Sequence, residues 1–214
     1  MDRRRLLMLQ QKQEGLPSGY TQLEYLQSTG TQWINTEYIL QSSDTFELKA
    51  EYVKKGSLKY TTAYLCGCDT NPDNGFCIAE DTNTNPTGYG MRDVFGFKKT
   101  FSNLRPEIGA KFVVASSINL LKVVVDETIT EISKSAQTYT PRKWPLYLFT
   151  TNRNGAAFDS AFIGKMYYAK ITDSQGAITL NCIPCLDVDG VPCMFDTVSR
   201  KTLYNVGTDN FTWG

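Results

Sequence analysis

Histidine is absent from this sequence of 214 residues. Its absence removes Ser–His and Cys–His nucleophile pairs, histidine general bases and histidine metal ligands together. Most hydrolase mechanisms need one of these groups. We therefore expect a chain that works by binding and is not an enzyme.

An excess of positive charge is also missing, since 22 Lys and Arg residues balance 22 Asp and Glu residues. A nucleic-acid ligand calls for a positive field, so we expect no nucleic-acid partner. No apolar run approaches the roughly 18 residues that span a bilayer, and we expect no membrane insertion.

A secretory signal is not evident either. The chain starts with basic residues, but the apolar run that follows extends only from Leu6 to Leu9 before Gln10 interrupts it. Export by that route is not expected. The six cysteines are therefore interpreted as reduced thiols of a cytosolic product rather than as a disulfide framework.

The residues that are present indicate an all-β domain. Phe46, Leu48, Ala50 and Tyr52 alternate with charged residues, which is the period of a strand with one face in a core. No segment after Pro17 shows a convincing helical period. With 41% hydrophobic residues, a single sandwich domain of about 200 residues can bury a sizeable core.

Further strands are expected in four later runs. Residues 112–133 are rich in β-branched residues and are interpreted as a hairpin that reverses at Asp126 and Glu127. Residues 145–152, 161–172 and 177–186 read as strands, with a turn at 173–176 before the last of them. Strands joined by turns favour a two-sheet antiparallel sandwich.

The first fifteen residues form a separate region, because they are rich in good helix formers and end at Gly15 and Pro17. A helix of about 12 residues with no core beneath it is marginal alone in water. We therefore expect residues 1–15 to be a short helical or extended arm that docks on a partner, and residues 16–214 to be the sandwich. The arm residues expected to anchor are Arg3, Arg4, Arg5, Leu6 and Leu9.

Both ends of the chain carry a recognisable pattern. The opening is LPSGYTQLEYLQSTGTQWINTEY (16–38), and the closing run is FIGKMYYAKIT (162–172) followed by NCIPCLDVDGVPCMFDTVSRKTLYNVGTDNFTWG (181–214). These segments resemble phage and prophage virion structural proteins of gut bacteria that contain a concanavalin A-like (laminin-G-like) domain. The family commonly has glycine where this chain has Arg200, which implies a different turn type there.

The resemblance implies an antiparallel jelly-roll sandwich and a role in a virion. The chain would be a capsid decoration, head fibre or tail-associated subunit, made in the host cytoplasm and attached to other virion proteins through residues 1–15. A homo-oligomer such as a trimer would be usual for such a subunit. A carbohydrate-binding, lectin-like module outside any virion is the alternative, and a polysaccharide-acting glycosidase is a weaker one.

Aromatic residues in polar loops are the plausible binding chemistry, since a Trp or Tyr face stacks on a sugar ring while nearby amides bind its hydroxyls. The candidates for a host-surface glycan are Trp144, Tyr89, Asn152 and Asn154, within and near the loops 83–93 and 151–159. The other two tryptophans, Trp33 and Trp213, are expected in the core.

No cofactor is expected, with calcium as the one alternative. Asp69, Asn71 and Asp73 supply oxygens with nearly the spacing of a helix-flanked calcium loop, but Gly75 falls one position late. The flanking residues read as strands, so a hairpin turn is the favoured interpretation. Laminin-G-like domains often hold calcium at a rim loop, which keeps the alternative open.

Two other patterns are interpreted structurally. Cys182, Cys185 and Cys193 could supply thiolates for zinc, with Cys66, Cys68 or Cys77 as a fourth ligand, but small buried thiols are favoured. Glu47 and Glu51 are the nearest approach to a glycosidase carboxylate pair. Lys49 lies between them on an alternating strand, so a solvated strand face is favoured.

Overall fold

The computed structural model describes residues 15–71, 74–81, 90–96, 98–102, 104, 106–135, 139–141 and 143–214. These residues form strands and turns, and none of them lies in a helix. No described segment is therefore a helix that could cross a membrane. The expected arm, including Arg3, Arg4, Arg5, Leu6 and Leu9, lies outside the described residues except for Gly15.

The strands are short at both ends of the chain and long in the middle of the sheets. In chain order they are β1 (Thr21–Gln22), β2 (Leu26–Ser28), β3 (Ile34–Asn35), β4 (Thr45–Lys54), β5 (Thr62–Asn71), β6 (Asn74–Asp81), β7 (Gly90–Gly96), β8 (Lys98–Phe101), β9 (Lys111–Ser116), β10 (Leu120–Val125), β11 (Thr128–Ser133), β12 (Tyr147–Leu148), β13 (Asn152–Arg153), β14 (Ala156–Ala157), β15 (Ile163–Thr172), β16 (Ile178–Leu186), β17 (Pro192–Asp196), β18 (Lys201–Leu203) and β19 (Thr212–Trp213).

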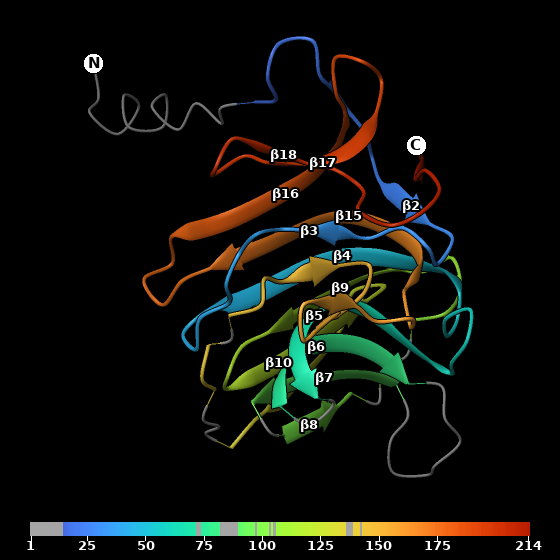
Figure 1. The fold of residues 1–214 in the computed structure, drawn as a ribbon. Helices are drawn as coiled ribbons and strands as arrows, with labels where there is room; N and C mark the ends of the chain where they lie inside the picture. Colours follow the sequence, from blue (N-terminus) through green and yellow to red (C-terminus); the bar gives the residue numbers. More distant parts are fainter. Residues whose placement is uncertain are drawn as a thin grey trace.

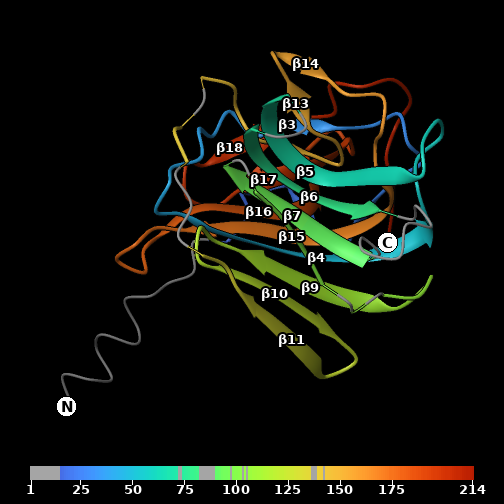
Figure 2. The same ribbon diagram turned by 90° about the horizontal axis from the view of Figure 1, so that it is seen from below.

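Two sheets stack one over the other (Figures 1 and 2). The large sheet has the order β11-β10-β9-β4-β15-β16-β17-β18, with β1, β2 and β19 added at its side. The small sheet has the order β14-β13-β5-β6-β7-β8, with β12 and β3 joined to β5. Among the named strands of the described residues, every pairing is antiparallel except that of β13 with β5. The expected two-sheet antiparallel sandwich is confirmed.

The core lies between the sheets and begins with the alternation in β4. Phe46, Leu48, Ala50 and Tyr52 are all fully buried, as the period-2 pattern predicts. Phe46 meets Phe76 of the small sheet edge to face, with ring centroids 5.5 Å apart. Aromatic contacts of this kind add to the burial of apolar area that holds two sheets together.

The run 112–133 forms three strands rather than the expected hairpin of two. The chain turns first between β9 and β10, and then at Asp126 and Glu127 between β10 and β11. Both turn residues have positive φ, 45° and 68°, which is the backbone of a tight two-residue turn. The reversal between β10 and β11 was predicted correctly. The reversal between β9 and β10 was missed because Ser116, Ser117 and Asn119 lie in a continuous β-like run.

The turn at Arg200 keeps the conformation that glycine favours. Its φ is 62°, in the left-handed region, so the expectation of a different turn type was wrong. The side chain explains why arginine can occupy the position. Its guanidinium lies 5.1 Å from the Phe195 ring and donates a hydrogen bond of 2.8 Å to the carbonyl oxygen of Gly15.

The start of the domain covers a small apolar cluster on the outer face of the large sheet. Cys185 of β16 and Cys193 of β17 are opposite each other with their sulfurs 3.5 Å apart, next to buried Phe195. Leu16 and Tyr20 pack on this cluster. All six cysteines of the chain are buried and unpaired by disulfides, which confirms the interpretation as small buried thiols.

Two other expectations needed correction. Trp213 is 50% exposed on the short strand β19, so it is not a core residue. Glu51 does lie on the outer face of β4, but it is only 8% exposed and therefore not solvated. Lys165 and Tyr167 cover it and donate hydrogen bonds of 2.7 and 2.6 Å to its carboxylate. Glu47 is paired in the same way with Lys170.

Gly164 in β15 is a sensitive position of the sandwich. A Cβ there would lie 2.3 Å from the carbonyl oxygen of Glu51 and 2.3 Å from the Phe162 ring. We expect Gly164→Ala to lower the free energy of unfolding by about 1–3 kcal/mol because the backbone of β4 must shift. Urea unfolding followed by circular dichroism measures the change. Gly15→Ala, which meets nothing within 4 Å, should change it by less than about 0.5 kcal/mol.

Candidate functional site

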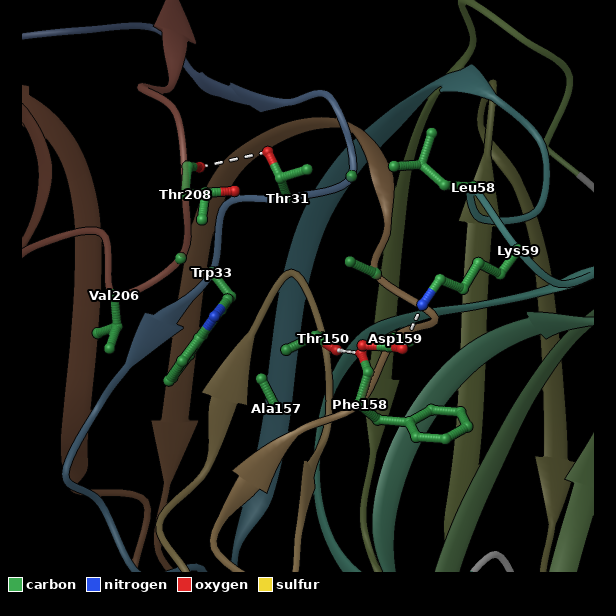
Figure 3. A pocket seen from close by; sticks show the side chains of 13 residues that line it. Thr31, Trp33, Leu58, Lys59, Thr150, Ala157, Phe158, Asp159, Val206 and Thr208 are labelled. Atoms are coloured by element: carbon green, nitrogen blue, oxygen red, sulfur yellow. Dashed lines mark hydrogen bonds and ion pairs between the residues drawn. The ribbon is translucent and has the colours of Figure 1, made fainter.

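A cavity of about 440 Å³ opens where loops from distant parts of the chain meet (Figure 3). Figure 3 shows Trp33 and Val206 on one side of it and Leu58 and Lys59 on the other. The full lining comprises Gly30, Thr31, Trp33, Leu58, Lys59, Thr150, Ala157, Phe158, Asp159, Ala161, Val206, Gly207 and Thr208. The volume is within the range of small-molecule sites in proteins.

Trp33 is held as a wall of the cavity by contacts on its ring and its backbone. Its indole stacks on Tyr147 of β12, with ring centroids 4.4 Å apart. Its backbone N–H donates to the side-chain oxygen of Asn205 at 3.0 Å, and its carbonyl accepts from the N–H of Val206 at 2.9 Å. A half-buried indole fixed in this way presents an apolar surface without losing side-chain freedom on binding.

Two glycines allow the loops to approach closely at the cavity. A Cβ on Gly207 would lie 2.0 Å from the carbonyl oxygen of Thr31 and 2.9 Å from the Trp33 ring. Gly30 has φ of 106°, and a Cβ there would lie 2.9 Å from the Leu58 side chain. Only glycine fits these places without movement of the walls.

Polar groups gather at the edge of the apolar surface. The Thr31 hydroxyl donates to the carbonyl oxygen of Thr208 at 3.2 Å and to the carboxylate of Asp209 at 3.0 Å. Lys59 forms an exposed ion pair with Asp159, and this hydrogen bond and charge raise the pKa of Lys59. The pair is charge-neutral as a unit, so the arrangement favours a neutral polar ligand over a highly charged one.

Tyr60, stacked on the lining residue Phe158, extends the aromatic surface beyond the cavity. The guanidinium of Arg153 lies 3.6 Å from the Phe158 ring centroid, and Tyr60 stacks on the same ring at 5.7 Å. Tyr60 is 49% exposed. The rim on the side of Lys59 is therefore an aromatic ledge that a chain-like ligand could follow out of the cavity.

Three of the four predicted glycan residues, Trp144, Asn152 and Asn154, are described by the structure and do not line this cavity. Trp144 is half-buried beside the turn of the β13–β14 hairpin, where a Cβ on Gly155 would lie 2.7 Å from its ring. Asn154 is exposed in that turn with φ of 55°. Asn152 is fully buried, and its amide donates to the carbonyl oxygen of Pro145 and accepts from Gly155. That burial makes Asn152 a structural residue, a correction to its proposed ligand role.

Tyr89 and Asp73 lie outside the described residues, and so do the side chains of Asp69 and Asn71. The backbone of the calcium candidate is nevertheless clear at its flanks. Asp69 pairs with Gly75 and Asn71 with Asn74 across β5 and β6, so the segment is a hairpin as favoured from the sequence. The flanks are strands, so the segment is not a helix-flanked loop, and calcium at the tip of this hairpin stays a prediction.

Cysteine and acidic side chains do not converge on a metal site in the part of the chain that the structure describes. No group of three or more of these side chains there could hold an ion. The sulfurs of Cys185 and Cys193 are in contact, while Cys182 faces the main core between the sheets. The alternation of β16 sends Cys182 and Cys185 to opposite faces, so the zinc interpretation does not hold for this trio.

Sequence reasoning missed the cavity because it assigned Trp33 to the core. Trp33 does pack against the core cluster, but it also faces the cavity. The signal that could have found it is the pair of Gly-Thr steps, 30–31 and 207–208, close to a tryptophan. The expected polar loop 151–159 contributes Ala157, Phe158 and Asp159 to the cavity, while its role in glycan binding stays a prediction.

No family model matches the chain, and no curated protein matches it. Among solved structures it is similar to the full extracellular region of zebrafish Gpr126/Adgrg6, with a TM-score of 0.50 and 11% sequence identity. The similarity covers 92% of this chain and 26% of that one, so the chain spans about a quarter of the larger structure. At this identity the likeness shows the fold alone: a concanavalin A-like (laminin-G-like) sandwich.

Asp187 supports the segment that leads to the cavity wall, and this gives a pH dependence. Its carboxylate accepts hydrogen bonds from the N–H groups of Val191 and Asp189 and from the hydroxyl of Tyr204, two residues before Val206. The bond from Val191 is the main cause that lowers the pKa of Asp187 below 3.8. A depressed carboxyl pKa stabilises the fold above the unfolded value, and the contribution is lost as pH falls through the folded value.

We therefore expect Asp187→Asn to lower the melting temperature at pH 7 and to differ less from the parent chain as pH falls below 3.8. Thermal scans across pH measure this. The exposed Asp189→Asn in the same turn is the matched control and should show a smaller effect at pH 7. A constant difference between Asp187→Asn and the parent at every pH would contradict the assignment.

Proposed function

We propose that the chain is a glycan-binding adhesion module of a bacteriophage virion, a structural protein without enzymatic activity. The observation that carries the glycan part is the cavity of about 440 Å³ with the fixed indole of Trp33 as one wall. Sugar rings have an apolar C–H face and polar edges. An indole face with hydroxyl, carbonyl and ion-pair groups around it is complementary to both.

The virion part is supported by the resemblance of residues 16–38 and 162–214 to phage structural proteins. Those same two segments supply one side of the cavity, with Gly30, Thr31 and Trp33 from the first and Gly207 and Thr208 from the second. In this proposal residues 1–15 attach the module to other virion proteins, and the loops around Trp33 face the host surface. In the expected homo-oligomer, several cavities would act together and raise a weak affinity.

The carboxylates considered for a glycosidase support a structural role instead. Glu51 is bound by Lys165 and Tyr167, and Glu47 by Lys170 and Tyr168, on the outer face of the large sheet. Neither lines the cavity. Binding without hydrolysis is the activity that this arrangement favours.

Trp33→Ala tests the glycan site. On an array of bacterial surface polysaccharides and their oligosaccharides, we expect the parent chain to bind a defined subset. The variant should bind those roughly ten-fold more weakly or worse, a loss of about 1.4 kcal/mol. Leu58→Ala, at an exposed position of the opposite wall, should also weaken binding. The matched control is Trp213→Ala, which removes an exposed tryptophan outside the cavity and should bind as the parent does.

Trp144→Ala separates the cavity from the site expected from the sequence. If binding depends on Trp144 and not on Trp33, the ligand sits at the β13–β14 hairpin. If no polysaccharide binds the parent chain even as an immobilised oligomer, the adhesion function is wrong.

A chain that begins at Leu16 tests the virion role. We expect it to keep its melting temperature, because the described core contains no residue before Leu16, but to be missing from particles assembled in its presence. Mass spectrometry of purified particles measures incorporation. Replacement of Arg3, Arg4 and Arg5 by alanine in the full chain should reduce incorporation too. Full incorporation of the shortened chain would contradict attachment through residues 1–15. If the parent chain itself is absent from the particles, a lectin-like module outside a virion is favoured.

A further inference from the structure

Asp93 and Lys134 form a buried pair that bridges the two sheets. Asp93 lies on β7 of the small sheet, and Lys134 directly follows β11 of the large sheet. Lys134 Nζ lies against Oδ2 of Asp93, and Ser116 of β9 donates a hydrogen bond from its hydroxyl to the same oxygen. Nζ also donates to the Ser116 hydroxyl at 3.3 Å. Three polar side chains thus converge inside the sandwich.

Their surroundings are apolar and shielded from water. The Lys134 and Asp93 side chains are 1% and 0% exposed. Nζ lies 5.4 Å from the ring centroid of Phe95, which in turn contacts Phe76 and Tyr139 edge to face. No donor among the described residues reaches Oδ1 of Asp93. One carboxylate oxygen is therefore left without the hydrogen bonds that a buried carboxylate needs.

Burial favours the uncharged forms of both groups. It raises the pKa of the Asp93 carboxyl and lowers the pKa of the Lys134 ammonium, while the attraction between the two acts in the opposite direction. In water an amine and a carboxylic acid exist as an ion pair, which opposes condensation. In an apolar interior that opposition weakens, because charge separation is costly there.

We propose that Asp93 and Lys134 condense to an intramolecular amide that joins the two sheets covalently. The neutral amine of Lys134 attacks Cγ of Asp93 and forms the C–N bond. The bond from Cγ to Oδ2 breaks, and Oδ2 leaves as water with the acid proton and one proton from Nζ. Oδ1 remains as the amide carbonyl. Amine and acid give amide and water, so atoms and electrons balance without an oxidant or co-reactant.

Ser116 is placed to move the proton in this step. Its oxygen accepts from Nζ and its hydroxyl donates to the departing Oδ2, so it can relay a proton between the two. The backbone holds the lysine in place, because the N–H of Lys134 donates to the carbonyl oxygen of Asn119 at 2.8 Å. Fixed, water-excluded reactants of this kind react at high effective concentration.

The ion pair of Glu51 and Lys165 on the outer face of the large sheet shows why amide formation is specific to Asp93 and Lys134. Lys165 and Glu51 are also in contact, at 2.7 Å, but their side chains are 22% and 10% exposed. A hydroxyl of Tyr167 donates to Glu51 and stabilises its ionised form. Glu51 and Lys165 therefore stay an ion pair, and they serve as an internal control.

The intact mass of the full chain, measured under denaturing conditions, tests the proposal directly. We expect a mass one water lower than the sequence requires. After trypsin, the peptide 93–98 should appear joined to the peptide 123–142, because an acylated Lys134 is no longer cleaved. Peptides containing Glu51 and Lys165 should be unlinked. The peptide map is essential, since an Asp-Gly step such as 189–190 can also lose water by forming a cyclic imide.

Variants separate the covalent bond from a simple ion pair. Lys134→Arg keeps the charge but should restore the full mass, whereas Lys122→Arg, at an exposed pair with Glu131, should still lose the water. Ser116→Ala should slow the loss of water after refolding without abolishing it. A parent chain with its full sequence mass, or with the loss of water located elsewhere, overturns the proposal whether or not the Lys134 variant folds.

Discussion

Burial of the inner face of β4 is the interaction on which the rest of the molecule depends. Phe46, Leu48, Ala50 and Tyr52 are fully buried, and β4 lies between β9 and β15 in the large sheet. Phe46 reaches Phe76 of the small sheet. Because the two sheets are fixed relative to each other, the ends of their strands are fixed too. The loops that join these strands, and the cavity walls that the loops form, are therefore held in defined positions.

The fold could be predicted because its signal is local. Period-2 alternation in β4, the β-branched residues of β9 to β11 and the apolar and aromatic residues of β15 are readable one strand at a time. The failures have a common physical cause in contacts made across the chain. Trp213 is exposed because β19 lies at the side of the large sheet, and Glu51 is covered because Tyr167 projects over it from a register shift in β15. Neither neighbour can be read from the flanking residues.

The candidate site was predicted only in part for the same reason. Its walls come from residues near 30, 58, 158 and 207, and the close approach of Gly207 to Thr31 appears only when the first and last segments meet. Asp93 and Lys134 are 41 positions apart, so no sequence motif indicated that their side chains meet. By contrast, local turn chemistry correctly predicted the hairpin at 69–74.

The burial of all six cysteines has a practical meaning for how the protein meets its environment. Not one sulfur is at the surface, so reagents that modify thiols, and the oxidants met outside a cell, have no ready point of attack on the folded domain. Chance cross-linking between neighbouring copies through disulfides is prevented as well. Because no native thiol is exposed, a cysteine introduced near Leu58 would be the sole reactive thiol of the folded domain. A thiol-reactive fluorophore would therefore label that position alone.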